Sequence, residues 1–232
     1  MRFSSVKAVT TSLVAVGCWL AIPSQASAVP FTVTSVLTGD FRDTNPDNLF
    51  VNVTITGDTT SNIANWVVDV ASPLHPDARL GVFAFNLALD LGQSVSFSNF
   101  SPASWTVTSP ADNVPGSGGA DFRFEAADPP GASNNVTNAV NLTFQSTLIG
   151  GNWSTLNFLN APLSDGAGIP DPGSQLGAHL QSLSTAGCSG CSDSGFASGN
   201  YQGPPTTSVP EPATLLLYGI GLLGAVAVRR RR

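Results

Sequence analysis

Two thiols stand three positions apart in Cys188-Ser189-Gly190-Cys191, a spacing used by redox pairs, metal sites and short disulfide loops. A redox pair needs its first cysteine at a helix N-terminus, which lowers the thiol pKa, and the surrounding glycines and serines predict no helix. Zinc needs two more ligands, and the spacing of His75 and His179 does not point to the cysteines. We therefore expect a Cys188–Cys191 disulfide, with redox and zinc chemistry as the alternatives.

Oxygen ligands recur at alternate positions in the segment 43–48, Asp-Thr-Asn-Pro-Asp-Asn, as they do in calcium loops. The twelfth position of such a loop would be Thr54, where a glutamate is usual. We expect a solvated turn whose side chains cap backbone amides, and no cofactor. The alternative is a calcium site with four ligands: Asp40, Asp43, Asn45 and Asp47.

Residues for enzyme chemistry are few. His75 stands among prolines, His179 lies in an apolar segment, and Glu125 is the only glutamate before position 211. The sequence contains no Gly-x-Ser-x-Gly elbow, His-Glu-x-x-His pair or phosphate-binding glycine loop. We expect a loop position for His75, a half-buried strand position for His179, a strand-surface charge at Glu125, and no enzymatic activity.

Aromatic side chains suggest a core more than a binding platform. Trp66, Trp105 and Trp153 lie within or beside alternating segments, where aromatic residues usually face the core. The alternative is that one of them stacks on a sugar ring. That alternative would make the chain a carbohydrate-binding module.

The segments that contain most of these residues are predicted to be β-strands. Apolar residues alternate with polar ones in several short segments, which predicts strands with one buried and one solvated face. Turn clusters rich in Gly, Pro, Asp and Ser separate them. We expect strands near 31–38, 51–55, 63–71, 83–89, 93–100, 104–108, 122–125, 140–145, 153–159 and 176–184, and a long loop within 160–190. This pattern predicts an all-β fold, a single antiparallel β-sandwich that is jelly-roll-like or immunoglobulin-like.

Charge is distributed unevenly along the 232 residues. Only 10% of residues are charged, and six of the nine basic residues lie at the two chain ends. Between positions 29 and 208, three arginines face fourteen acidic residues, a formal charge of 3 − 14 = −11. Such a body repels phosphates, so we exclude nucleic acid as a partner.

The first 28 residues have the layout of a secretory signal peptide. Arg2 and Lys7 precede an apolar run over 8–22, and Ala26-Ser27-Ala28 supplies the small residues that signal peptidase requires. Cleavage after Ala28 would make Val29 the new N-terminus. A retained membrane anchor is the alternative, although fifteen apolar residues are short for a span.

The C-terminal end has three successive parts. Val209-Pro210-Glu211-Pro212 is followed by an uncharged segment, 213–228, and then by Arg229, Arg230, Arg231 and Arg232. We expect 213–228 to form a transmembrane helix whose arginines stay in the cytoplasm, which places the preceding body on the far side of the membrane. The expected organisation is a signal peptide over 1–28, a β-sandwich over 29–201, a linker over 202–208 and a tail over 209–232.

This tail resembles the PEP-CTERM sorting signal of Gram-negative bacteria, with Pro210, Glu211 and Pro212 matching the motif that names it. The resemblance covers residues 209–232. It implies recognition by an exosortase, a membrane-embedded cysteine protease or transpeptidase, which cuts near the motif and passes the body to the cell surface. Such proteins typically accompany exopolysaccharide and biofilm production. An ordinary C-terminal anchor is the alternative.

Together these features predict an exported protein of the cell surface or extracellular matrix. It would pass through an inner-membrane intermediate, with signal peptidase and an exosortase as processing partners and extracellular polysaccharide as a candidate ligand. We expect the β-sandwich to have a structural or adhesive role. The alternatives are a secreted carbohydrate-binding module and, with less support, a hydrolase.

Overall fold

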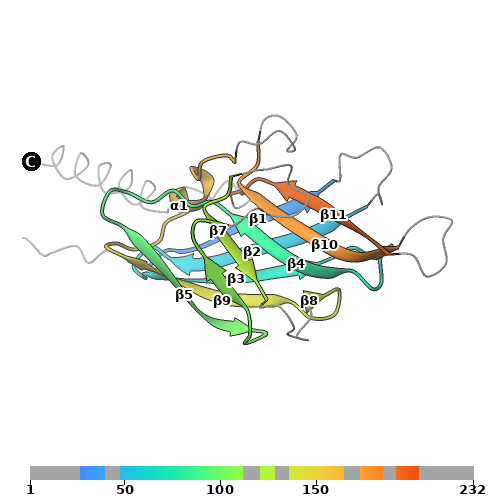
Figure 1. Ribbon diagram of the computed structural model, residues 1–232. Helices are drawn as coiled ribbons and strands as arrows, with labels where there is room; N and C mark the ends of the chain where they lie inside the picture. The colour runs from blue at the N-terminus through green and yellow to red at the C-terminus, as the bar shows by residue number, and fades with distance from the viewer. Residues whose placement is uncertain are drawn as a thin grey trace, which may run out of the picture.

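The computed structural model describes residues 27–39, 48–111, 121–128, 136–164, 173–184 and 192–203. The described residues form strands joined by turns, with one short helix, α1 (Leu156–Leu159) (Figure 1). The strands are β1 (Pro30–Thr38), β2 (Phe50–Asp58), β3 (Ile63–Val70), β4 (Arg79–Phe85), β5 (Ser94–Ser101), β6 (Thr106–Thr108), β7 (Phe124–Ala127), β8 (Val136–Thr137), β9 (Leu142–Ile149), β10 (Leu176–Ser184) and β11 (Ser192–Gly199).

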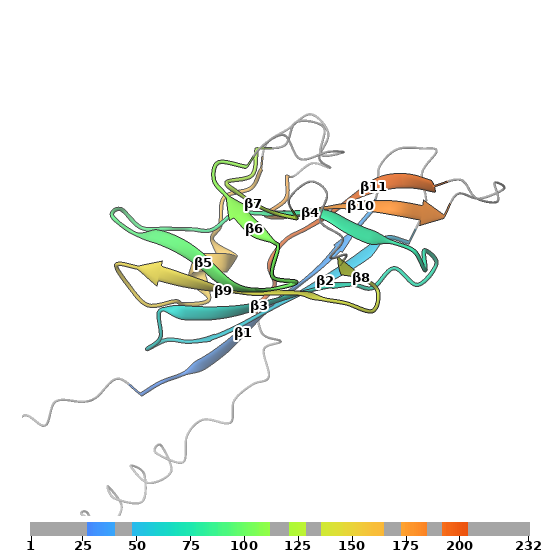
Figure 2. The same cartoon turned by 60° about the horizontal axis from the view of Figure 1, so that its bottom comes forward.

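All the strand pairs are antiparallel and belong to one sheet. Its order is β5-β9-β3-β2-β1-β11-β10-β4-β7-β6, and β8 pairs with β4 beside this path. The sheet folds over itself, so that β5, β9, β3, β2 and β1 form one layer and β11, β10, β4, β7 and β6 face them from above (Figure 2). The all-β prediction is confirmed, and the fold is a barrel-like sandwich made from one sheet.

The expectation of a jelly-roll-like or immunoglobulin-like sandwich, which has two separate sheets, needs correction on this point. β5 and β6 stand at opposite ends of the strand order, yet they follow one another in sequence and are linked only by residues 102–105. The short link forces the two ends of the sheet together, and β5 and β6 contact each other without forming a ladder. The sheet therefore nearly closes, leaving an incomplete seam between β5 and β6, called the seam below.

The two layers are joined at the opposite side by β1 and β11. These strands pair at Thr38 and Ser198, and the chain beyond β11 returns to β1 through a bridge between Thr34 and Gln202. Gly199 lies at this junction, where a Cβ atom would come within 2.8 Å of the Val36 carbonyl oxygen. We call this junction, Thr34 to Thr38 against Ser198 to Gln202, the corner.

The space between the layers is filled by aromatic and branched side chains. Trp66 on β3 stacks on Phe144 of β9, with 5.2 Å between ring centroids, and its indole Nε1 donates a hydrogen bond to Ser146 Oγ at 2.9 Å. Trp66, Trp105 and Trp153 are all buried, which confirms the core interpretation of the tryptophans. Alternation within β1, β2, β3 and β9 follows the predicted one-face burial.

The prediction of a solvated outer face on 83–89 is wrong in two respects. The strand ends at Phe85, and Ala84 and Asn86 are buried. A second, smaller cluster of Val82, Ala84, Phe122 and Phe196 covers the outer face of β4. Phe196 comes from β11, two strands away in the sheet. The periodicity of β4 alone therefore could not predict that its outer face is buried.

Two other predicted elements differ. Residues 153–159 contain α1 and not a strand: Trp153, Asn157 and Phe158 are buried, a helical spacing, and Ser154 N donates to Asn157 Oδ1 at 2.9 Å. β11 was not predicted, because its Ser, Gly and Asp have low strand propensity. It forms since β10 pairs with it along most of its length.

No helix in the described part of the chain has the length and apolar character needed to cross a membrane. The predicted transmembrane helix over 213–228 lies outside the described residues.

Candidate functional site: the two chain ends

The described chain ends where it leaves the corner. Gln202 forms a two-way backbone pair with Thr34: Thr34 N donates to Gln202 O at 3.0 Å, and Gln202 N donates to Thr34 O at 2.7 Å. Because this pair is antiparallel, residues 201–203 run in the direction of Pro30, the first residue of β1. Gln202, the first residue of the predicted linker over 202–208, is thus held by a backbone pair with β1.

Tyr201 anchors this exit in the core. The residue is only 7% exposed, its ring packs against Phe158 at 5.8 Å and Trp66 at 6.4 Å between centroids, and its hydroxyl donates to the Asn86 carbonyl oxygen at 3.0 Å. Burial raises the pKa of the Tyr201 phenol well above its usual value. The phenol is therefore neutral in the folded protein at neutral pH.

A buried amide reinforces the same exit. Gln175 Oε1 accepts from Tyr201 N at 2.9 Å, and Gln175 Nε2 donates to Ala161 O at 2.7 Å. Gln175 N donates to Asn200 Oδ1 at 2.9 Å, while Ser35 Oγ donates to Asn200 O at 2.9 Å. These bonds hold Asn200 and Tyr201, near the end of the described chain, to Gln175 and to Ser35. The sequence analysis did not predict them. The only sequence signal was the apolar Tyr201 immediately before a proline-rich stretch.

The other chain end leaves from the same side of the fold. Val29 N donates to Thr59 Oγ1 at 3.2 Å, and Thr59 N donates to Val29 O at 3.1 Å, so the sheet begins to hold the chain at the residue that cleavage after Ala28 would expose. Ala28 itself is exposed, and Ala26 lies outside the described residues. Both attachment points to the predicted membrane segments thus lie toward the Pro30 end of β1.

Both histidines of the chain are buried. His75 lies in the β3–β4 loop, as predicted, but it is only 4% exposed, and its Nδ1 accepts a hydrogen bond from Ser184 N at 3.1 Å. His179 on β10 is 6% exposed and pairs with Val82 and Phe196 in the outer cluster, so it is more deeply buried than expected. Glu125 on β7 is half-buried and not the predicted surface charge.

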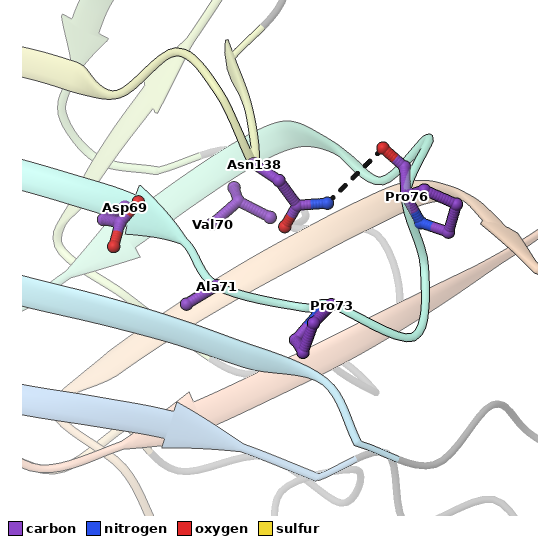
Figure 3. A pocket seen from close by; sticks show the side chains of 6 residues that line it. All are labelled: Asp69, Val70, Ala71, Pro73, Pro76 and Asn138. Atoms are coloured by element: carbon purple, nitrogen blue, oxygen red, sulfur yellow. Dashed lines mark hydrogen bonds between the residues drawn. The ribbon is translucent and has the colours of Figure 1, made fainter.

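A shallow hollow of about 520 Å³ lies beside the end of β3 (Figure 3). Its lining residues are Asp69, Val70, Ala71, Pro73, Pro76 and Asn138. Asn138 is occupied in holding the loop together: Oδ1 accepts from Ser72 N at 2.9 Å, and Nδ2 donates to His75 O at 2.9 Å. Asp69 and Asn138 are the polar side chains of the lining, and the other four are apolar, so we interpret the hollow as a loop junction.

The two remaining sequence-predicted sites fall outside the described residues. These are the calcium candidates Asp40, Asp43, Asn45 and Asp47 and the disulfide pair Cys188 and Cys191. Among the residues that are described, no three His, Cys, Asp or Glu side chains gather where they could hold a metal ion. Calcium binding and the disulfide stay predictions.

Residues 208–232 match the family model of the PEP-CTERM protein-sorting motif, which includes Val209 to Pro212 and the four terminal arginines. No curated protein and no solved structure matches the chain. The motif implies an exported protein that an exosortase processes at the membrane before surface display. The sorting resemblance is thereby confirmed for this segment.

Proposed function

We propose that this protein is an exported component of the cell surface or extracellular matrix whose barrel-like domain, taken as residues 29–201, has a structural or adhesive role without catalysis. The observation that carries the proposal is the PEP-CTERM sorting motif at residues 208–232. The proposed route is export by the signal peptide, transient anchoring by 213–228, and cleavage by an exosortase near 209–212.

The geometry of the chain ends supports this route. Gly203 and Pro210 are seven residues apart, a reach of roughly 25 Å when fully extended. The anchored intermediate would therefore hold the Pro30 end of the domain within a short distance of the membrane surface. Because Tyr201 and Gln202 are fixed by the fold, cleavage after them removes no residue on which the described core depends.

The absence of catalysis is part of the proposal, and the burial of both histidines supports it. A general base must reach a substrate proton within hydrogen-bond distance. His75 is engaged by Ser184 N, and His179 lies among the side chains of the outer cluster. If substitution of both histidines and of Glu125 abolished a turnover by the folded protein, this part of the proposal would be rejected.

The sorting proposal is tested by replacing Pro210, Glu211 and Pro212 with alanine in a tagged full-length chain in the native host. We expect the variant to accumulate unprocessed in the inner membrane, whereas the matched control, alanine at Pro204, Pro205 and Thr206, is processed like the parent. Release of the motif variant at the parental rate would refute sorting through the tail.

Polysaccharide binding is a second candidate, supported by one feature of the outer sheet face. Gln145 on β9 donates through Nε2 to Asn65 Oδ1 on β3 at 2.9 Å and accepts from Asn99 Nδ2 on β5, so three strands present a fixed row of uncharged amides. Such groups suit the hydroxyls of a neutral sugar. If this candidate holds, alanine at Asn65 and Gln145 weakens retention on matrix polysaccharide. No retention of the parent on any matrix polymer would exclude it.

A further inference from the structure

The core is sealed less completely at the seam than elsewhere. Six hydrophobic residues pack against the main core while remaining partly exposed: Leu89, Val95, Phe97, Phe100, Val107 and Leu159. Three of them belong to β5, one to β6, and Leu89 precedes β5. The incompletely covered apolar surface of the core is thus concentrated on the two strands that end the sheet.

β5 also has a backbone edge that no described strand uses. Among the described residues its only ladder partner is β9. β6 has three residues and is joined to the end of β5 by residues 102–105, and within the described residues no strand pairs with the second edge of Ser94 to Ser98. An unused edge presents a row of N–H and C=O groups that pair readily with another strand.

The usual protections of an edge strand are missing from Ser94-Val95-Ser96-Phe97-Ser98. The segment has no charged residue and no proline, and its serines point outward while Val95 and Phe97 point toward the core. The one irregularity comes later: the register shifts between Ser98 and Ser101, with Asn99 at a φ of 57°. The first five residues of β5 are therefore a regular edge, open to pairing.

Charge indicates which partner suits this edge. Residues 91–111 contain no charged side chain, and neither do residues 129–164, which include the neighbouring β9. The body as a whole has a formal charge of −11, and pairing of two copies through these uncharged segments brings no carboxylates of β5 or β9 together. A strand from an identical copy also supplies the matching alternation of serine and apolar side chains.

We propose that two copies of this protein associate by antiparallel pairing of β5 with β5 of the second copy. The contact is isologous and closes with two-fold symmetry, and it covers the exposed parts of Val95 and Phe97 in both copies. It extends each sheet across the dimer. This inference does not depend on how the tail is processed, because it concerns only the folded domain.

The test uses the full-length chain displayed by its host, with single cysteines introduced at Ser96 or, as a control, at Thr32. Both are exposed hydroxyl residues on the outer face of the same layer, at opposite sides of it. A short bis-maleimide is added to intact cells, and dimers are resolved on reducing gels. We expect at least a tenfold higher dimer yield from Ser96→Cys than from Thr32→Cys.

A charge variant completes the test. Ser96→Asp places two carboxylates near the symmetry axis, so we expect Ser94→Cys cross-linking to fall at least tenfold when Ser96→Asp is added, while Thr32→Asp leaves it unchanged. Circular dichroism of the purified chains checks that each variant is folded. Equal cross-linking from Ser96→Cys and Thr32→Cys, or cross-linking unaffected by Ser96→Asp in a folded protein, would overturn the proposal. Either result leaves the sorting test unaffected.

Discussion

The two layers of the sheet meet at the corner and at the seam, and these regions are completed in different ways. At the corner β1 and β11 share few ladder positions, yet side-chain hydrogen bonds of Tyr201, Asn200 and Gln175 close the junction, and those of Tyr201 and Gln175 are buried. At the seam β5 and β6 are joined by a short loop but form no ladder, and the core beneath them is partly exposed. Polar side-chain bonds complete the corner, whereas the described residues at the seam meet by ring packing, as of Phe97 on Phe124 at 5.5 Å between centroids, and without a ladder.

This difference shows that the specific polar side-chain contacts between the layers are concentrated at the corner. The corner holds the chain exit, which is fixed by bonds to Ser35 on β1, to Gln175 before β10 and to Asn86 after β4. The seam holds a strand edge with no such bonds. We expect substitutions at the corner to affect folding stability and substitutions at the seam to affect association.

Aromatic truncation should give the largest contrast. Tyr201→Ala removes a buried ring that contacts Phe158 and Trp66, and we expect it to lower the free energy of unfolding by about 3–5 kcal/mol. Phe97→Ala at the seam removes a partly buried ring and should cost roughly 2 kcal/mol. Urea unfolding of both variants measures the difference. A larger loss at Phe97 than at Tyr201 would contradict the contrast.

A single methyl group tests the close approach at the corner. Gly199→Ala places a Cβ atom 2.8 Å from the Val36 carbonyl oxygen, and the backbone of β1 must shift to relieve the contact. We expect a loss of about 1–3 kcal/mol by urea unfolding. Gly203→Ala is the control, because its nearest neighbour would be Leu159 Cδ1 at 3.6 Å. Equal stability of the two variants would show that β1 and β11 can move apart at Gly199 without a loss of stability.

The Tyr201 hydroxyl should give a smaller, pH-dependent effect. At neutral pH, Tyr201→Phe removes the bond to Asn86 and should cost about 1 kcal/mol. Because burial raises the folded-state pKa of this phenol, its contribution is full below the unfolded pKa near 10. As the pH rises from there toward the folded pKa, the parent should lose stability relative to the variant by about 1.4 kcal/mol per pH unit. A parent–variant difference constant up to pH 11 would contradict the burial of an un-ionised phenol.

The smallest effect is expected on the solvated face beside the seam. Gln145→Ala breaks the bonds to Asn65 and Asn99, both of which are exposed, so water replaces the lost partners. We expect a change below about 1 kcal/mol in urea unfolding. A loss as large as that of Gly199→Ala would mean that the amide row, and not the core, holds β5 to the sheet.

The sequence predicted most strands because their inner faces alternate cleanly. Val51, Val53 and Ile55 on β2 are buried as the period of two requires. It did not predict β11, whose Ser and Gly residues form a strand only because β10 lies beside them. Nor did it show that the sheet is continuous, since alternation gives the buried face of a strand and not its neighbours.

The candidate site divides in the same way. The sorting tail is a contiguous motif, so its residues could be identified by type and order alone. The exit anchors could not: Asn86, Gln175 and Tyr201 are separated along the chain by 89 and 26 residues, that is 175 − 86 and 201 − 175, and only the fold brings them together. Asn and Gln are common in this chain, and nothing local distinguishes the buried ones.

Intact mass spectrometry of the mature protein recovered from its native host is the most direct test of the account. If signal peptidase and an exosortase both cut the chain, the measured mass corresponds to a polypeptide that begins at Val29 and ends close to residues 209–212. This polypeptide lacks the apolar tail and its arginines. A mass corresponding to Met1 through Arg232 in the mature, folded protein would contradict it.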